Sequence, residues 1–409
     1  MNNLKFNDYK QSKYKYTSLF YEGFALVMDK NNLYGFIDKK GKEVIPCQYI
    51  DARYFSEGLV AVQKLDTQRW GFINTKGEEV IPFKFLNAGW FNEGLAEVKL
   101  EHEYGMGNYW TYIDKNGKKI TDVELSYAST FMNGHGLVKR ASSDYFSYLQ
   151  KDGSIDGSYA IAFQFSNGRA IVEVDKYIYS LNEELGIVSS IKKDRIIKVG
   201  QYNNGFYLAE DINRDLIYLD DFFECDTIPD SFQSAEDFSD GRAIVKLSPN
   251  WIGVLSEDGK VMAFSTNYQY RKINNFSEGY AAVQNIDRYW GYINKDGKEV
   301  IPCQYVQADD FSDGLAGVLD KGGIIYYIDQ EGDKKITFDD CYYSSIELED
   351  KTIIIKAKNS QELANKKLQV LKLIKQEMIE KTVDIIDQLA YDESSTLFKP
   401  KTRKKKNKN

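Results

Sequence analysis

Apolar and polar residues alternate along most of the chain, in short runs separated by turn-forming residues. Runs such as GLVAVQ, GLAEVK, GRAIVKL and GYAAVQ place an apolar side chain at about every second position. A period of two predicts half-buried β-strands. Each run is followed by a polar loop, a second strand-like stretch such as WGFIN, a glycine-containing turn, and a return stretch such as EEVIP. The pattern therefore predicts an all-β protein built of short meanders.

The meanders recur in step with an aromatic-x-x-glycine motif. Nine such motifs follow one another at intervals of 34 to 40 residues, and their glycines are Gly23, Gly58, Gly94, Gly134, Gly168, Gly205, Gly241, Gly279 and Gly314. A period of this size is typical of propellers, solenoids and other repeat arrays. Because one unit cannot bury both of its faces, the units must stack on one another. We expect the glycine to allow a tight turn and the aromatic residue to fill the space between neighbouring units.

Each unit is expected to contain three strands, or four if the aromatic-rich link between units also pairs. Pro46, Pro82 and Pro302 end the third strand in three of the units, because proline cannot donate to a strand ladder. Nine or so such units predict a propeller-like ring, with an open twisted β-solenoid as the alternative. The stretches KYKYTSLF and KTIIIKAK, at the two ends of the array, resemble incomplete units that could close a ring or cap an open array.

Units that combine RWGFIN, YWGYIN or LYGFID with GKEVIP and FSEG resemble the bacterial WG repeat family. The similarity is close over residues 24–60, 58–96 and 279–318, and some similarity covers residues 15–357. Thr111 replaces the glycine in YWTYID, and the stretches YFSYLQKDG, LIYLDDFFE and WIGVLSEDG lack the Trp-Gly pair. The resemblance implies a β-repeat scaffold without catalytic residues, and the departures put regular packing in doubt mainly over residues 140–240.

The chain changes character after residue 358. Residues 359–390 carry Leu363, Leu368, Leu371, Ile374, Met378, Ile385 and Leu389 at helical spacing. We therefore divide the chain into a β-repeat array (1–358), a C-terminal amphipathic helix (359–390) and a disordered basic tail (391–409). The helix could dock on the last β unit or hold a partner. Seven of the last eleven residues are Lys or Arg, so the tail could contact polyanions or serve only for solubility.

The net charge and the cysteine content narrow the classes of function that this protein could have. The formal net charge is -8, which argues against a nucleic-acid grip on the main body. No apolar run has the length of a signal peptide or a membrane span, so we expect a cytoplasmic protein. Cys47 and Cys303 occupy the same place in two units, and we interpret them as half-buried packing residues and not as a disulfide or metal pair.

Few residues suggest catalysis. The two histidines, His102 and His135, lie at different phases of the repeat, and no phosphate-binding loop, serine elbow or HExxH motif is present. Trp70, Trp110 and Trp290 could stack on carbohydrate, but their fixed phase favours packing between units. The sequence assigns no catalytic, cofactor-binding or metal-binding residue and no cofactor.

Two hypotheses of different classes follow. The first is a non-catalytic scaffold for protein–protein interaction, in which loops of variable length give specificity. The second is a ligand-binding or glycan-binding protein, or an enzyme, that uses a pocket at the mouth or groove of the array. The second hypothesis predicts polar residues that converge in one pocket, most readily in the units that depart from the consensus. The identity of the protein partner is not encoded in any motif.

Overall fold

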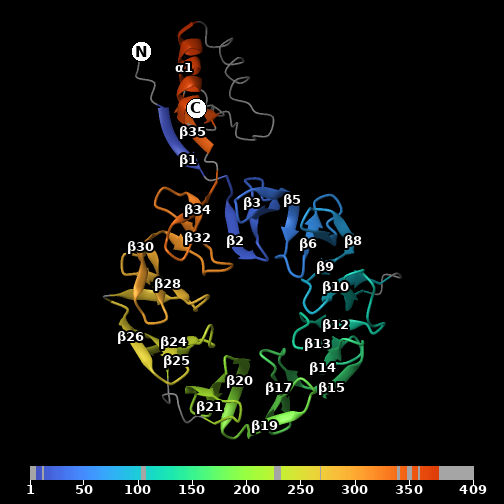
Figure 1. Ribbon diagram of the computed structural model, residues 1–409. Helices are drawn as coiled ribbons and strands as arrows, with labels where there is room; N and C mark the ends of the chain where they lie inside the picture. Colours follow the sequence, from blue (N-terminus) through green and yellow to red (C-terminus); the bar gives the residue numbers. More distant parts are fainter. Residues whose placement is uncertain are drawn as a thin grey trace, which may run out of the picture.

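The computed structural model describes residues 6–11, 13–102, 107–224, 232–267, 269–338, 341–347, 352–357 and 360–376. In these residues nearly every regular element is a β-strand, and the strands form nine antiparallel units arranged in a ring (Figure 1). The predicted all-β repeat fold is thereby confirmed, and the arrangement is propeller-like and not an open solenoid. We number the units 1 to 9 in chain order.

The strands of units 1 to 4 form two seven-stranded sheets, each shared by two units. Unit 1 contains β2 (Tyr16–Tyr21), β3 (Phe24–Met28), β4 (Tyr34–Asp38) and the first part of β5 (Glu43–Ala52); unit 2 contains the rest of β5, β6 (Leu59–Lys64), β7 (Trp70–Asn74) and β8 (Glu79–Phe85); unit 3 contains β9 (Asn87–Ala88), β10 (Leu95–Glu101) and β11 (Asn108–Asp114); unit 4 contains β12 (Leu125–Ala128), β13 (His135–Arg140), β14 (Phe146–Gln150) and β15 (Ile155–Tyr159).

Units 5 to 9 each form a separate sheet. Unit 5 contains β16 (Ile161–Ala162), β17 (Ala170–Val174), β18 (Tyr177–Leu181) and β19 (Ile187–Lys192); unit 6 contains β20 (Ile196–Asn203), β21 (Phe206–Asp211) and β22 (Leu216–Leu219); unit 7 contains β23 (Ser234–Ala235), β24 (Arg242–Ser248), β25 (Trp251–Ser256) and β26 (Val261–Ser265); unit 8 contains β27 (Tyr270–Ile273), β28 (Tyr280–Asn285), β29 (Trp290–Asn294) and β30 (Glu299–Tyr305); unit 9 contains β31 (Gln307–Ala308), β32 (Ala316–Leu319), β33 (Ile325–Ile328) and β34 (Lys334–Thr337).

The aromatic-rich link supplies the fourth strand of a unit. In unit 7, for example, the link strand β23 pairs with β24, so that the order is β23-β24-β25-β26. Strand β5 serves two units, because its first part pairs with β4 and its last residues pair with β6. The link therefore both ends one unit and begins the next.

The nine motif glycines each form the second residue of a two-residue turn. In unit 2 the turn residues Glu57 and Gly58 have φ of 54° and 80°, and Ser56 and Leu59 exchange backbone hydrogen bonds of 3.0 and 3.1 Å across the turn. Two consecutive positive φ angles are the geometry of the hairpin turns whose twist matches that of the strands. Glycine adopts this conformation without cost, whereas glutamate does not.

The acidic residue of one turn binds the next turn around the ring. The Glu57 carboxylate accepts a hydrogen bond of 3.0 Å from the Gly94 amide, and neighbouring turns face the middle of the ring (Figure 1). The same contact is made by Glu22, Glu93, Asp240, Glu278 and Asp313 to the amides of Gly58, Gly134, Gly279, Gly314 and Gly23. Units 4 to 6 carry asparagine at this position, and none of these three asparagines accepts such a bond from the next glycine in the described residues.

The ring closes through contacts that repeat those between consecutive units. Ser312 Oγ in unit 9 donates a hydrogen bond of 2.6 Å to the Phe20 carbonyl in unit 1, as Ser277 Oγ donates one of 2.8 Å to the Phe311 carbonyl. Tyr327 donates its hydroxyl to the Ser18 carbonyl, and the buried side chains of units 1 and 9 share one hydrophobic cluster. Unit 9 therefore packs on unit 1 as on any sequence neighbour.

A small sheet outside the ring joins the two ends of the described chain. It consists of β1 (Phe6–Gln11), β35 (Cys341–Glu347) and β36 (Thr352–Ala357) in the order β1-β35-β36, and it lies beside the junction of units 9 and 1 (Figure 1). The stretch KTIIIKAK thus forms part of this sheet and not the first strand of a further unit, because its partner is β35.

The helix α1 (Ser360–Gln376) contacts β35 and β36, and Leu363 on it is buried, as is Ile355 of β36. Residues 377–390 of the predicted helix, its first residue Asn359 and the basic tail 391–409 lie outside the described residues. In the part of the chain that is described, no helix is both long enough and apolar enough to cross a membrane.

Candidate functional site

The repeated tryptophans pack between units. Trp70 is only 3% exposed and belongs to the core shared by units 2 and 3, and Trp110 and Trp290 are partly buried against the corresponding cores. The Arg53 guanidinium lies over the Trp70 ring, with Cζ 4.4 Å from the ring centroid. The interpretation of these tryptophans as packing residues is confirmed by their burial.

The two histidines lie apart and each is engaged locally. His102 Nε2 is 3.0 Å from Glu124 Oε1. His135 is buried, its Nδ1 lies 2.8 Å from the Asn133 carbonyl, and its ring stacks on Phe165. The structure therefore does not bring the histidines together as a pair.

Cys47 and Cys303 are free and half-buried, as predicted. The Sγ atoms lie 3.9 Å from the Val27 carbonyl and 3.8 Å from the Val283 carbonyl. Burial raises the pKa of each thiol to about 12, so both remain protonated and unreactive at neutral pH. In the described residues no group of three or more His, Cys, Asp or Glu side chains is placed to hold a metal ion.

One buried carboxylate departs from the repeat pattern. Glu97 is on β10, at the position where units 1, 4 and 5 have Leu26, Leu137 and Ile171. It is 8% exposed, its Oε1 is 3.3 Å from Thr130 Oγ1, and its Oε2 has no hydrogen-bond partner among the described residues. Burial raises the pKa of Glu97 to about 7.

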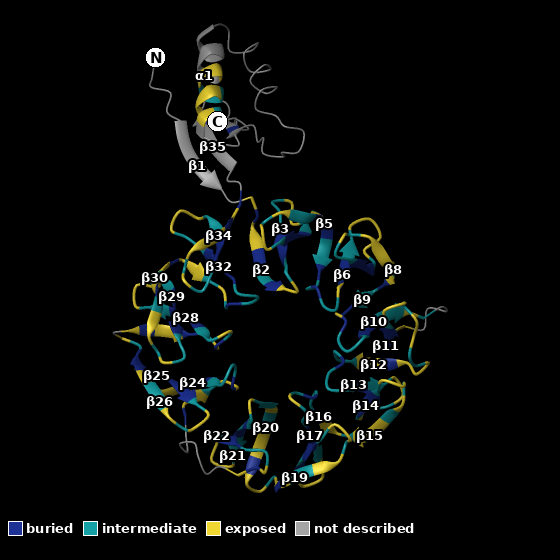
Figure 2. Ribbon diagram, in the orientation of Figure 1, coloured by how far each residue is buried: buried dark blue, intermediate teal, exposed yellow. Residues whose placement is uncertain are grey.

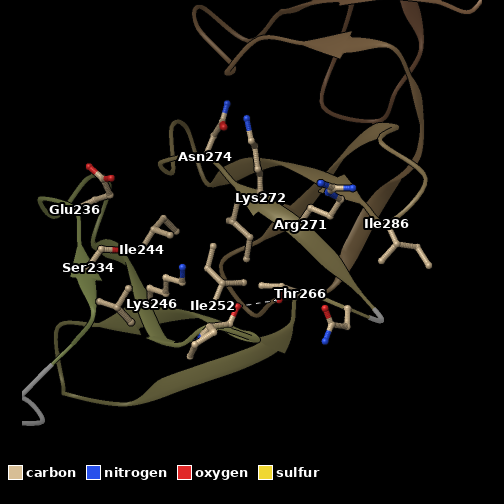
Figure 3. Close-up of a pocket in the computed structure, with 14 residues that line it drawn as sticks. Ser234, Glu236, Ile244, Lys246, Ile252, Thr266, Arg271, Lys272, Asn274 and Ile286 are labelled. Atoms are coloured by element: carbon tan, nitrogen blue, oxygen red, sulfur yellow. Dashed lines mark hydrogen bonds between the residues drawn. The ribbon is translucent and has the colours of Figure 1, made fainter.

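A cleft lies between units 7 and 8 (Figure 3). Its volume is about 660 Å³, and its walls come from β23, β24, β25, β27 and the loops after β26 and β28. Apolar side chains form the floor: Ile244 and Ile273 are buried, and Ile252 is partly buried against the same cluster. Thr266 also lines the cleft, and its backbone amide donates a hydrogen bond of 2.9 Å to the Asn250 carbonyl.

The walls of this cleft are rich in positive charge. Lys246, Arg271 and Lys272 line it with one acidic residue, Glu236, and the polar Ser234 and Asn274. The three cationic side chains are exposed, and none makes an ion pair or side-chain hydrogen bond with another residue that the structure describes. In Figure 3 the side chains of Glu236, Lys272 and Asn274 point to the same open side. The cleft can therefore receive an anionic group without first breaking an internal ion pair.

A second hollow of about 500 Å³ lies beside Arg242 and Lys295 on the same two units. Its charged groups already have partners: Lys295 Nζ is 2.6 Å from Asp240 Oδ1, and Lys260 Nζ is 2.5 Å from Asp258 Oδ2. This hollow therefore has fewer unpaired lysine and arginine side chains than the cleft.

Sequence reasoning did not identify the cleft residues. WIGVLSEDG in unit 7 was recognised as a departure from the consensus, but Arg271 and Lys272 lie in the link of unit 8, which shows no motif. The signal that could have found them is the coincidence of three features: isoleucine in the tryptophan position, Lys246 beside it, and two further cations in the next link.

A family model described as the WG containing repeat matches residues 34–66, 70–104, 110–140, 266–289 and 290–323. These segments cover part of unit 1, units 2 and 3, part of unit 4, unit 8 and part of unit 9, and none of them includes a strand of units 5 to 7. The search of curated proteins found no match to this chain.

One solved structure supports the overall fold. A crystal structure of a eukaryotic initiation factor aligns over 83% of this chain and 96% of its own, with 8% identity and a TM-score of 0.52. BamB from Moraxella catarrhalis aligns over 71% of this chain and 94% of its own, with 12% identity and a TM-score of 0.36. The computationally designed Ika8 protein aligns over 78% and 96%, with 10% identity and a TM-score of 0.34. At these identities only the fold is shared, and only the first score is high enough to support that conclusion.

Proposed function

Because this chain belongs to the WG repeat family, we propose that it is a non-catalytic scaffold for protein–protein interaction. The proposal rests on a difference between two sets of residues, those that recur in the units and those that differ from unit to unit. The shared motif residues hold the ring, as Trp70, Ser277 and Asp313 show. Side chains that differ between units remain for recognition, and repeat folds use such positions to bind partners.

The cleft between units 7 and 8 supports a binding role over a purely architectural one. Its exposed cations sit at the rim of an apolar floor, which resembles the composition of a protein interface where apolar and aromatic anchors are surrounded by polar groups. A partner protein is the occupant that this combination favours. We place the interaction in the cytoplasm, on the grounds of the free, half-buried Cys47 and Cys303.

A small acidic ligand is the second candidate, favoured by the cleft volume of about 660 Å³. This size lies within the range of roughly 300–1,000 Å³ that is usual for small-molecule sites. An acidic metabolite or glycan would satisfy the same cations, and an enzyme or lectin could be built on such a pocket.

The two candidates are separated by capture of the full-length protein from its native host under cross-linking, followed by mass spectrometry. The scaffold proposal predicts a protein recovered in near-stoichiometric amount, with cross-links to lysines of the ring. Recovery of a small molecule by native mass spectrometry, with no protein above background, would support the second candidate instead.

The basic tail is expected to add a separate, salt-sensitive contact with polyanions. Deleting residues 399–409 should remove the retention of the protein on heparin, because seven of those residues are Lys or Arg and each neutralised anionic group releases counterions. The melting temperature should not change. Retention that survives the deletion would place the basic surface elsewhere on the protein.

A further inference from the structure

The cleft between units 7 and 8 lies at the position where units 2, 3 and 8 hold a tryptophan. Gly253 in unit 7 occupies the place of Gly71 in unit 2, so Ile252 occupies the place of Trp70. The units that keep this glycine have Tyr34, Trp70, Ile252 or Trp290 in front of it. Units 5, 6 and 9 also have an aliphatic residue at this position, Ile178, Leu216 and Ile325, but without the glycine after it. Among the described residues, unit 7 is the one unit that keeps the glycine and lacks the aromatic ring.

In unit 2 the indole of Trp70 fills the space that becomes the cleft in unit 7. Trp70 packs with Phe85 at the end of β8 and with Ala88 of unit 3, and it lies beneath Arg53. In unit 7 the corresponding neighbours are Tyr270 and Ile273, which belong to the same cluster as Ile252. The apolar floor is thus kept, while the ring that would cover it is absent.

Lys246 occupies a position at which lysine lies over an aromatic ring in other units. In unit 3 the equivalent Lys99 Nζ is 5.8 Å from the centroid of the Trp110 ring, and in unit 4 Lys139 Nζ is 4.2 Å from that of Phe146. Lys246 is the fifth residue after its motif glycine, as Lys99 and Lys139 are after theirs. It therefore has the placement for a cation–π contact and lacks the ring.

The charged residues around the position of the missing aromatic ring indicate which groups should flank an aromatic side chain that binds there. Arg271 and Lys272 come from the link strand of unit 8 and line the cleft opposite β24. The corresponding residues of unit 3 are Leu86 and Asn87, which carry no charge. An aromatic side chain with carboxylates on neighbouring residues would satisfy these two cations and the apolar floor at once.

We propose that the cleft binds an aromatic side chain flanked by acidic residues from a partner polypeptide, which completes unit 7 from outside. This inference rests on the proposed scaffold function and gives its partner a chemistry. The chain's own repeats show that a tryptophan fits the position, and the unpaired Lys246, Arg271 and Lys272 make the complementary segment acidic.

A peptide experiment tests the inference directly. The probe is acetyl-Glu-Asp-Trp-Asp-Glu-amide, and its affinity for the full-length protein is measured by isothermal titration calorimetry. Replacing the probe's Trp by Ala, or its acidic residues by Lys, should weaken binding about tenfold or more, because a buried aromatic anchor and its charge complement dominate such contacts.

Variants of the protein test whether the probe binds in the cleft. Ile252→Trp supplies the ring from within and should weaken probe binding about tenfold or more, with no loss of thermal stability. Lys272→Glu should weaken binding as well, whereas Lys198→Glu, which changes the equivalent exposed residue in unit 6, should leave it unchanged. Equal affinity of the wild type and Ile252→Trp, or no dependence on the probe's Trp, would overturn the inference.

A failure of the cleft inference can be distinguished from a failure of the proposed scaffold function. If the partner captured from the host binds Ile252→Trp as well as it binds the wild type, the scaffold function stands and the cleft inference falls. If an oligonucleotide displaces the probe and binds more tightly than it, the cations serve a polyanion and the inference is equally wrong.

Discussion

Trp70 and Ile252 occupy equivalent positions and have opposite consequences. The indole of Trp70 is 3% exposed and completes the joint between units 2 and 3, whereas the smaller Ile252 leaves a cleft between units 7 and 8. The tryptophan therefore fills the joint in one unit, and a cleft lies at the equivalent position in another.

Replacing Trp70 by Ala should reduce the free energy of unfolding by ~3–5 kcal/mol, because a large buried side chain is lost and a cavity remains. Trp290→Ala should cost less, since Trp290 is only partly buried. Chemical denaturation measures both effects. Trp251→Ala is the control, because this side chain is 46% exposed and its loss should cost less than about 1 kcal/mol. A Trp70→Ala protein with an unchanged denaturation midpoint would contradict the packing role.

Glu97 should make the stability of the protein fall as pH rises. Burial raises its pKa to about 7 in the folded protein, above the unfolded value of about 4.3. Between these two pH values the unfolded chain releases the proton first, so ionisation favours unfolding. The loss should approach ~4 kcal/mol above pH 8, at about 1.4 kcal/mol per pKa unit.

Denaturation of the wild type and Glu97→Gln at pH 5 and pH 8 checks this effect. The variant should gain stability relative to the wild type at pH 8 and much less at pH 5, because glutamine does not ionise. Parallel pH profiles for the two proteins would show that Glu97 does not titrate as its burial implies.

The two-residue turns form a chain of hydrogen bonds around the ring that is interrupted in units 4 to 6. The Gly94 amide donates to the carboxylate of Glu57 and the Gly279 amide to that of Asp240. Gly168 and Gly205 follow units with asparagine at the acidic position, and their amides have no corresponding acceptor in the described residues. The turns of units 5 and 6 therefore lack this particular hydrogen bond.

Hydrogen–deuterium exchange should resolve this difference. We expect the amides of Gly94 and Gly279 to exchange about tenfold more slowly than those of Gly168 and Gly205, because local opening is easier where fewer hydrogen bonds hold the backbone. Exchange at equal rates in all four turns would mean that the carboxylates do not order the joints.

The sequence predicted elements that depend on local patterns and missed those that depend on distant pairing. The aromatic-x-x-glycine motif located all nine turns, and alternation located the strands after them. The pairing of β1 with β35 joins residues more than 300 positions apart, and no short pattern specifies such a partner. The cleft was missed for a similar reason, because Lys246 and Lys272 belong to different units and meet only when these units pack.

The whole molecule combines a closed ring with a small sheet that ties its two ends. Unit 9 contacts unit 1 through Ser312, Asp313 and Tyr327, and no described strand of one unit pairs with a strand of the other. The pairing of β1 with β35 adds a second connection beside the junction (Figure 1). Figure 2 shows buried residues in every unit around the ring. Closure leaves no unit at a free end, so the apolar faces that a repeat must cover are covered by other units.

Distances between spin labels test ring closure most directly. In a cysteine-free background, labels are placed on the equivalent hairpin turns of adjacent units, at Lys40 and Lys76 for units 1 and 2, and at Glu331 and Lys40 for units 9 and 1. All three side chains are exposed. Pulsed electron–electron double resonance should give similar distances for the two pairs, because units 9 and 1 are neighbours in the ring. A distance between Glu331 and Lys40 that is several times longer than that between Lys40 and Lys76 would show an open array and contradict the closed nine-unit ring.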